Sequence, residues 1–217
     1  MANTTEMVFI IDKSGSMSGL ESDTIGGFNS NISKQRETGE NVLVTTVLFD
    51  TTFETLYDRV NISEVEKMTT KDYCPGGCTA LCDAVGNTIN RIKYAQQYLK
   101  KEERPDKTLF VIITDGFENS SREFSSSQIK KLITTQKKEN DWEFLFLGAN
   151  MDAVETANNY GIDADKAVTY MADAIGTSNA WNTLGAATAC FLKEGCKAFS
   201  NGSWSKKIKE DTKSRKA

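Results

Sequence analysis

Residues 12–19 read DKSGSMSG and place oxygen-bearing side chains at alternate positions of one short segment. Asp12 directly follows the apolar run at residues 7–11, and Ser14 and Ser16 come two and four positions later. A carboxylate and two hydroxyls in this spacing fit a helix cap, a catalytic nucleophile or a site for a hard cation. The helix cap is the simplest of the three, because Ser16 or Ser18 precedes a helical pattern.

Two more segments bring an oxygen ligand to a strand end or a helix start. Thr79 precedes a long helical pattern, and Asp115 follows the apolar run at residues 108–113. If the strands at 7–11 and 108–113 are neighbours, Asp12 and Asp115 meet at the same edge of the sheet. Three hydroxyls and two carboxylates then face one point. Oxygen ligands of this kind suit Mg²⁺, and they also accept Mn²⁺ or Ca²⁺.

Several catalytic interpretations conflict with the residues present. The chain has no histidine, which excludes Ser-His-Asp triads, Cys-His dyads and imidazole zinc sites. A phosphoryl-accepting Asp12 would require a second aspartate two positions later, where Ser14 stands. Ser16 is not in a nucleophile elbow, and the glycines form no Walker loop. A metal-dependent phosphatase or hydrolase that uses the same cation stays open as an alternative to a binding module.

The cysteines raise a separate possibility, a site for a soft metal. There are five of them, at positions 74, 78, 82, 190 and 196. The first three recur every four residues, but Pro75-Gly76-Gly77 interrupts any helix between them, and structural zinc normally takes four ligands. We therefore expect Cys82 to pack under the long helix, Cys78 to be exposed, and the last two cysteines to lie in the core. An odd number of cysteines in a reducing compartment makes a disulfide framework unlikely.

Strand and helix patterns alternate along the chain. We expect strands at residues 7–11, 42–49, 52–60, 108–113, 143–147 and 166–170. We expect helices at 20–38, 79–101, 125–139, 152–160 and 173–198, and a short helical turn at 62–68. This alternation predicts an α/β, doubly wound, Rossmann-like fold with a mostly parallel six-stranded sheet and helices on both faces. The hairpin formed by the second and third strands supplies one antiparallel edge strand.

The length and composition of the chain indicate how many domains it has and which classes of partner it does not favour. Residues 1–200 fit a single domain, and residues 201–217 form a polar, Lys-rich tail that we expect to be frayed. The net charge of −4 gives no electrostatic case for nucleic acid or an anionic membrane. No run approaches 18 apolar residues, and the first residues show no secretory signal pattern. We therefore expect a cytoplasmic protein with neither nucleic acid nor membrane as its partner.

The order of these motifs resembles that of von Willebrand factor A domains, the family of the integrin inserted domains. Their metal-ion-dependent adhesion site (MIDAS) has the pattern D-x-S-x-S, then a threonine in a loop, then an aspartate after a central strand. The matching residues here are Asp12, Ser14, Ser16, Thr79 and Asp115. The resemblance covers roughly residues 5–170 and is closest to stand-alone cytoplasmic members of bacteria and phages. It implies the strand order 3-2-1-4-5-6.

The resemblance also implies a function. Ser14, Ser16 and Thr79 would hold the metal directly or through one water, and the two aspartates would act mostly through bound water. One coordination position would stay open for an Asp or Glu of a partner protein. The implied protein is a Mg²⁺-dependent binding module and not an enzyme. A structural subunit with an empty site is a third possibility, beside the hydrolase.

Other side chains near the expected site have simpler roles. We expect turn or capping roles for Asp50, Asp83, Glu118 and Asn119. Phe117 follows Asp115-Gly116 and is a candidate exposed contact at the rim of the site. In the last helix, an apolar stripe is expected to pack on the sheet; it consists of Ile175, Trp181, Leu184, Ala187, Cys190 and Phe191.

Overall fold

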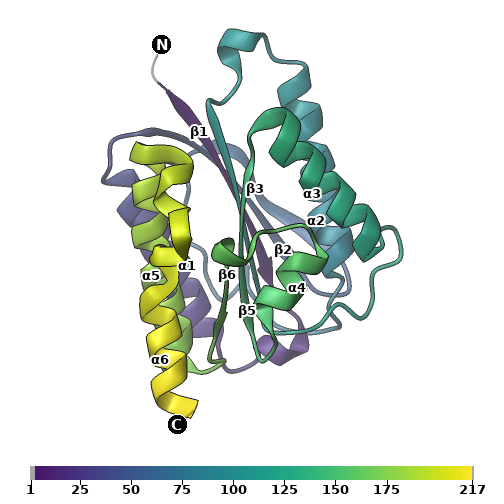
Figure 1. Ribbon diagram of the computed structural model, residues 1–217, viewed down its shortest axis with the longest axis vertical. Coiled ribbons are helices and arrows are strands. Elements are labelled where there is room, and N and C mark those ends of the chain that lie inside the picture. The colour runs from purple at the N-terminus through teal and green to yellow at the C-terminus, as the bar shows by residue number, and fades with distance from the viewer. Residues whose placement is uncertain (1–2, 217) are drawn as a thin grey trace.

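Six strands form one sheet in the computed structural model, which describes residues 3–216 (Figure 1). The strands are β1 (Thr4–Asp12), β2 (Asn41–Phe49), β3 (Phe53–Asn61), β4 (Lys107–Thr114), β5 (Glu143–Ala149) and β6 (Ala167–Tyr170). Their order is β3-β2-β1-β4-β5-β6, and every neighbouring pair is parallel except β2 and β3. The predicted fold class and strand order are confirmed. Met1, Ala2 and Ala217, which the expected domain and tail include, lie outside the described residues.

Helices cover both faces of the sheet. They are α1 (Glu21–Arg36), α2 (Leu81–Gln97), α3 (Ser126–Asn140), α4 (Ala153–Asn159), α5 (Ala174–Glu194) and α6 (Lys206–Lys216). Short 3₁₀ segments are η1 (Gly15–Met17), η2 (Lys101–Glu103), η3 (Ala164–Lys166) and η4 (Gly195–Ser205). In Figure 1, α1, α5 and α6 lie on one side of the sheet and α2, α3 and α4 on the other.

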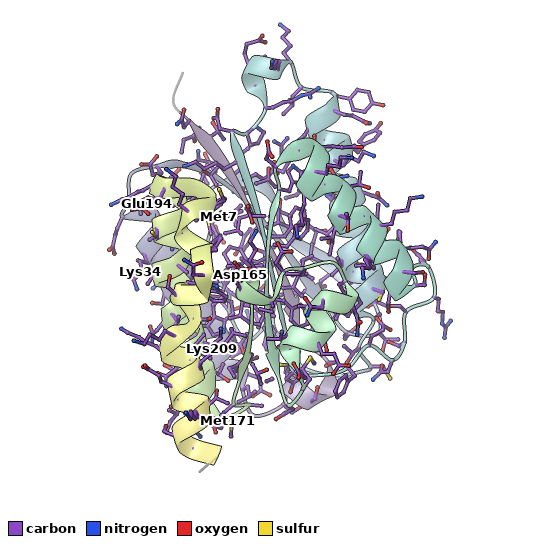
Figure 2. All side chains as sticks on the ribbon, viewed as in Figure 1. Met7, Lys34, Asp165, Met171, Glu194 and Lys209 are labelled. Atoms are coloured by element: carbon purple, nitrogen blue, oxygen red, sulfur yellow. The ribbon has the colours of Figure 1, made fainter. Side chains whose placement is uncertain are left out.

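The central strands are buried on both faces, which explains their unbroken apolar sequences. Met7, Phe9 and Ile11 of β1 point into the core beneath α1 and α5. Val8 and Ile10, on the opposite face of the same strand, pack beneath α2 and α3. Figure 2 shows side chains filling the space on both sides of the sheet. Parallel strands covered by helices on both sides present both faces to an apolar core, which favours long apolar runs such as residues 7–11.

The segment at 62–68, expected to form a helical turn, is not helical. Its backbone groups are satisfied by side chains of α1 instead. The Arg36 guanidinium donates hydrogen bonds to the carbonyl oxygens of Ile62 and Val65, at 2.7–3.0 Å. The Asn29 amide group both donates to the Met68 carbonyl and accepts from the Met68 N–H. These long-range bonds remove the need for a local helix, because every buried backbone group needs only one partner.

The segment after residue 200 was expected to fray, and this prediction is wrong for the described residues. Residues 206–216 form α6, which contacts α5 and β6. Trp204 and Ile208 are buried, and the Thr212 hydroxyl donates to the Thr169 carbonyl at 3.2 Å. Arg215 forms an ion pair with Asp173, which caps the start of α5. The apolar residues among the lysines therefore anchor this helix to the domain.

The last predicted helix also differs in detail. It ends at Glu194, earlier than expected, because Gly195 adopts φ +65° and the chain continues as the 3₁₀ segment η4. Cys190 is only partly buried and Cys196 is exposed, so the prediction that both lie in the core is wrong. Ile175 is exposed as well, whereas Trp181, Leu184, Ala187 and Phe191 of the stripe are buried.

A pair of neighbouring glycines in α1 provides a test of how tightly α1 and α5 pack. A Cβ on Gly27 would lie 2.2 Å from Cγ of Trp181, whereas a Cβ on Gly26 would meet nothing within 4 Å. We expect Gly27→Ala to destabilise the protein by about 1–3 kcal/mol through overpacking. We expect Gly26→Ala to stabilise it by about 0.5–1 kcal/mol, because alanine favours the helix. Urea unfolding measures the free energy of unfolding of both variants. Changes of the same sign in the two variants would contradict the close packing of α1 on α5.

Candidate metal centre

The ends of β1 and β4 bring the first two predicted residues to one edge of the sheet. Ile11 pairs with Ile113 in the parallel register, so Asp12 lies level with Thr114, and Asp115 follows one residue later. The buried Asp12 carboxylate accepts a hydrogen bond from the Ser14 N–H at 2.7 Å and one from the Thr114 hydroxyl at 2.6 Å. Asp12 therefore links the segment of Ser14 and Ser16 to the end of β4.

The structure brings all five predicted site residues together. The hydroxyl oxygens of Ser14 and Ser16 lie 3.1 Å apart, and Ser16 donates to Oδ1 of Asp115 at 2.5 Å. The hydroxyl oxygen of Thr79 reaches the same point, because a Cβ on Gly116 would lie 3.0 Å from it and 3.4 Å from the Ser16 hydroxyl. The three hydroxyls and the Asp115 carboxylate thus lie close together, and Asp12 holds the Ser14 backbone beside them.

Backbone contacts hold the loop that carries Thr79 against the first segment. The Gly15 N–H donates to the Gly77 carbonyl at 3.2 Å, and the Gly76 N–H donates to the Lys13 carbonyl at 2.8 Å. The Thr79 N–H donates to Oδ1 of Asn119 at 2.9 Å. These hydrogen bonds join the loop that carries Thr79 both to the segment of Ser14 and Ser16 and to the segment after β4. The position of each hydroxyl therefore depends on the other segments.

Both carboxylates of the site are desolvated. Burial is the largest influence on each and raises the pKa of Asp12 and of Asp115 above the usual range. Among residues 3–216, neither carboxylate forms an ion pair with a basic side chain; the nearby Lys13 pairs with Glu54. Oδ2 of Asp115 is buried and has no hydrogen-bond partner within the residues that the structure describes. Negative charge that is buried without compensation, beside hydroxyl oxygens, fits the requirements of a hard divalent cation.

The acidic residues around the site hold backbone N–H groups. Asp50 and Glu118 do so in turns and at the start of α2, as expected, whereas Asp83 holds a distant loop. The Asp83 carboxylate accepts from the N–H groups of Arg122, Glu123 and Phe124, at 2.8–2.9 Å. Glu118 accepts from the N–H groups of Cys82, Ser120 and Ser121. Asp50 accepts from the N–H and the hydroxyl of Thr52. These contacts order the loop after Asp115 and the start of α2.

Tyr73 contributes to the site, although its position in the sequence gave no indication of this. Its buried hydroxyl donates to the backbone carbonyl of Asp12 at 2.6 Å. The residue lies in the loop at 69–78, 61 positions after Asp12. A contact over that separation depends on how the loop crosses the end of β1, and no local spacing encodes it.

The cysteines near Thr79 are not arranged for a soft metal. In the part of the chain that the structure describes, no group of three or more His, Cys, Asp or Glu side chains is placed to hold a metal ion. Cys82 is buried under α2, with its sulfur 3.8 Å from the Tyr160 hydroxyl, and Cys78 is exposed, both as expected. Cys74 is exposed too. A thiolate site at these three positions is therefore not formed.

A hollow of about 600 Å³ lies along the carboxyl ends of β5 and β6, beside the site. Its lining residues are Phe117, Asn150, Met151, Asp152, Thr169, Tyr170 and Met171. Phe117 stands at its rim with 62% of its surface exposed, two positions after Asp115. Figure 2 labels Met171 at the lower end of the molecule, the end toward which the parallel strands run. The exposed side chain of Phe117 thus stands next to the hydroxyl and carboxylate oxygens of the site.

Known structures resemble this fold, although no family model and no curated protein matches the sequence. The von Willebrand factor type A protein of Catenulispora acidiphila superposes with a TM-score of 0.59 at 14% identity, over 87% of this chain and 43% of that one. The fold is that of a von Willebrand factor A domain. The corresponding domain of the type V pili tip protein Mfa5 from Porphyromonas gingivalis gives a TM-score of 0.60 at 11% identity, over 90% and 98%.

A third known structure in this comparison carries a metal. Proximal thread matrix protein 1 from the mussel byssus, with a zinc-occupied MIDAS motif, gives a TM-score of 0.58 at 13% identity, over 87% of this chain and 46% of that one. The present chain spans less than half the length of this protein and of the Catenulispora protein. At these identities the likeness concerns the von Willebrand factor A fold alone.

Proposed function

We propose that this chain is a protein-binding module that depends on a divalent cation, with Mg²⁺ as the first candidate and Mn²⁺ or Ca²⁺ as alternatives. One observation carries the proposal: three hydroxyls lie close to two buried carboxylates that have no basic partner among residues 3–216. Buried carboxylates are costly unless positive charge compensates them. A hard cation supplies that charge and takes oxygen ligands.

The five residues would have two different roles at the cation. Ser14, Ser16 and Thr79 would offer hydroxyl oxygens to the cation, and Asp12 and Asp115 would balance its charge and orient the hydroxyls. Asp12 already holds the Ser14 backbone, and Asp115 already holds the Ser16 hydroxyl. With few direct carboxylates, the cation would keep affinity for one more anionic ligand, which we propose to be an Asp or Glu of a partner protein.

Two further observations support this proposal. The mussel protein with the same fold has a zinc-occupied MIDAS motif, so the fold can hold a divalent metal. Beside the site, Phe117 and the hollow next to it offer a surface on which a partner segment could rest while its acid reaches the cation. The partner, its carboxylate and the stand-alone bacterial or phage origin stay predictions.

We also propose a cytoplasmic location with neither nucleic acid nor membrane as partner. Among residues 3–216, no helix is both long and apolar enough to cross a bilayer. All five cysteines are free thiols, which suits a reducing compartment. The net charge of −4 does not favour a polyanionic partner.

Thermal melting of chelator-treated protein, titrated with Mg²⁺, Mn²⁺ and Ca²⁺, tests the metal site. A ligand that binds only the folded state adds about 2.7 kcal/mol of stability at 100 times its Kd. For a chain of this size we therefore expect the melting temperature to rise by roughly 5–10 °C. If none of the three ions raises it, the proposed metal dependence is wrong.

The metal-dependent hydrolase stays the alternative prediction, because it would use the same cation. A screen of phosphoesters with Mg²⁺ or Mn²⁺ checks it. Turnover by the wild-type protein that disappears in Asp12→Asn would favour the enzyme over the binding module.

A further inference from the structure

Two buried polar atoms near the carboxyl ends of β4 and β6 have no hydrogen-bond partner in the described part of the chain. One is the hydroxyl of Tyr170, the last residue of β6, which is only 2% exposed. The other is Oδ2 of Asp115. One is a donor and the other an acceptor, and a buried tyrosine hydroxyl normally has a partner.

The register of the sheet places these two residues in one row. Thr114 of β4 pairs with Gly148 of β5, and Ala149 of β5 pairs with Tyr170 of β6. Asp115 comes one residue after Thr114, so Asp115, Ala149 and Tyr170 lie level across three neighbouring segments. Since adjacent strands are about 4.8 Å apart, the outer two backbones are roughly 10 Å apart.

Tyr170 and the end of β4 also border the same core. Ile113 and Tyr170 both belong to the core beneath α1 and α5, and Asp115 stands two positions after Ile113, in the bend that directly follows β4. Between Asp115 and Tyr170 stands Ala149, fully buried, whose methyl group leaves room for a tyrosine ring to lean across. A tyrosine side chain is long enough to span most of this gap.

Tyr170 is also available as a donor at neutral pH. Burial, followed by the nearby charges of Asp115 and Asp12, raises the pKa of the Tyr170 hydroxyl well above its usual range. The neighbouring Tyr73 is not available in the same way, because its hydroxyl is bonded to the Asp12 carbonyl.

We propose that Tyr170 is a positioning residue of the metal centre: its hydroxyl donates to Oδ2 of Asp115 through one water, since the two atoms form no direct hydrogen bond. Ser16 holds Oδ1 of the same carboxylate, so the two donors fix its orientation from both sides. A carboxylate oxygen has two lone pairs, and the second one of Oδ2 stays free to face the cation site. This role rests on the proposed function, because it concerns the affinity for the cation.

Titration with Mn²⁺, with the free ion followed by electron paramagnetic resonance, tests the role in the wild type, Tyr170→Phe and Tyr160→Phe. Tyr160 is the matched control: it is also buried, but it packs on the other face of the sheet against Cys82. Loss of a hydrogen bond that orients a metal ligand typically weakens metal affinity 10- to 100-fold. We expect at least a tenfold loss for Tyr170→Phe and less than a twofold change for Tyr160→Phe.

Melting in chelator separates this role from a structural one. Among residues 3–216 the Tyr170 hydroxyl has no direct hydrogen-bond partner, so Tyr170→Phe should melt at or above the wild-type temperature without metal. Equal Mn²⁺ affinity of Tyr170→Phe and wild type would overturn the positioning role and leave the metal site intact. If the wild type itself binds no Mn²⁺, the proposed function fails and the role fails with it.

Discussion

Asp115→Asn is expected to melt at a higher temperature than the wild type in chelator and at a lower temperature in saturating Mg²⁺. Burial raises the pKa of the Asp115 carboxyl, which means that its charged form is disfavoured in the metal-free fold. An amide of the same shape removes that charge and can still accept from Ser16. With Mg²⁺, only the wild type gains the stability that a bound cation supplies, about 2.7 kcal/mol at 100 times its Kd.

In chelator, the difference in melting temperature between Asp115→Asn and the wild type should depend on pH. The direction of the pKa shift of Asp115 determines how. A carboxyl with a raised pKa in the folded state favours folding when it is protonated, and this contribution is lost as the pH rises through the raised pKa. The advantage of Asp115→Asn over the wild type should therefore be largest near neutral pH. It should shrink as the pH falls through the raised pKa of Asp115 toward the ordinary aspartate range.

Asp141→Asn provides the matched control for this crossover. Asp141 ends α3 with φ +52°, a left-handed conformation that asparagine also tolerates, and it lies just before β5, at the opposite edge of the sheet. Its melting temperature should respond to Mg²⁺ as the wild type does. A normal Mg²⁺ response in Asp115→Asn would contradict the assignment of Asp115 to the metal centre.

Ile208→Ala is expected to destabilise the whole domain, although its residue lies in a segment rich in lysine. Ile208 of α6 is 1% exposed and belongs to the core beneath α1 and α5. Removing a buried isoleucine side chain to the Cβ typically costs about 2–5 kcal/mol. For a chain of this length we expect the melting temperature to fall by roughly 5–15 °C. A single cooperative transition should be retained, because α6 packs on α5 and β6.

Lys207→Ala is the control for Ile208→Ala, because Lys207 is the preceding residue of α6 and is exposed. A change at an exposed position without special contacts is usually within about 0.5 kcal/mol. If Ile208→Ala behaves like Lys207→Ala, α6 contributes little to the fold, and the sequence-based expectation of a frayed tail would be restored.

The residues of the metal centre could be found from the sequence because each follows a local signal. Asp12 and Asp115 stand directly after apolar strands, and Thr79 stands before a helix. Parallel strands deliver the residues that follow them to one edge of the sheet, so the convergence follows from the alternation of strands and helices. The strand order came from the resemblance to von Willebrand factor A domains, and the structure confirms it.

The sequence by itself determined the fold class, the sheet edge that carries the site and the five oxygen-bearing residues that meet there. Only the tertiary structure decided which distant groups support them, namely Tyr73 beneath Asp12 and Tyr170 level with Asp115. It also decided that the last segment is an anchored helix, because Ile208 is buried by elements far away in the sequence. The physical reason is the same in each case: strand ends and helix starts are encoded locally, whereas the partners of a buried side chain depend on how separate elements pack.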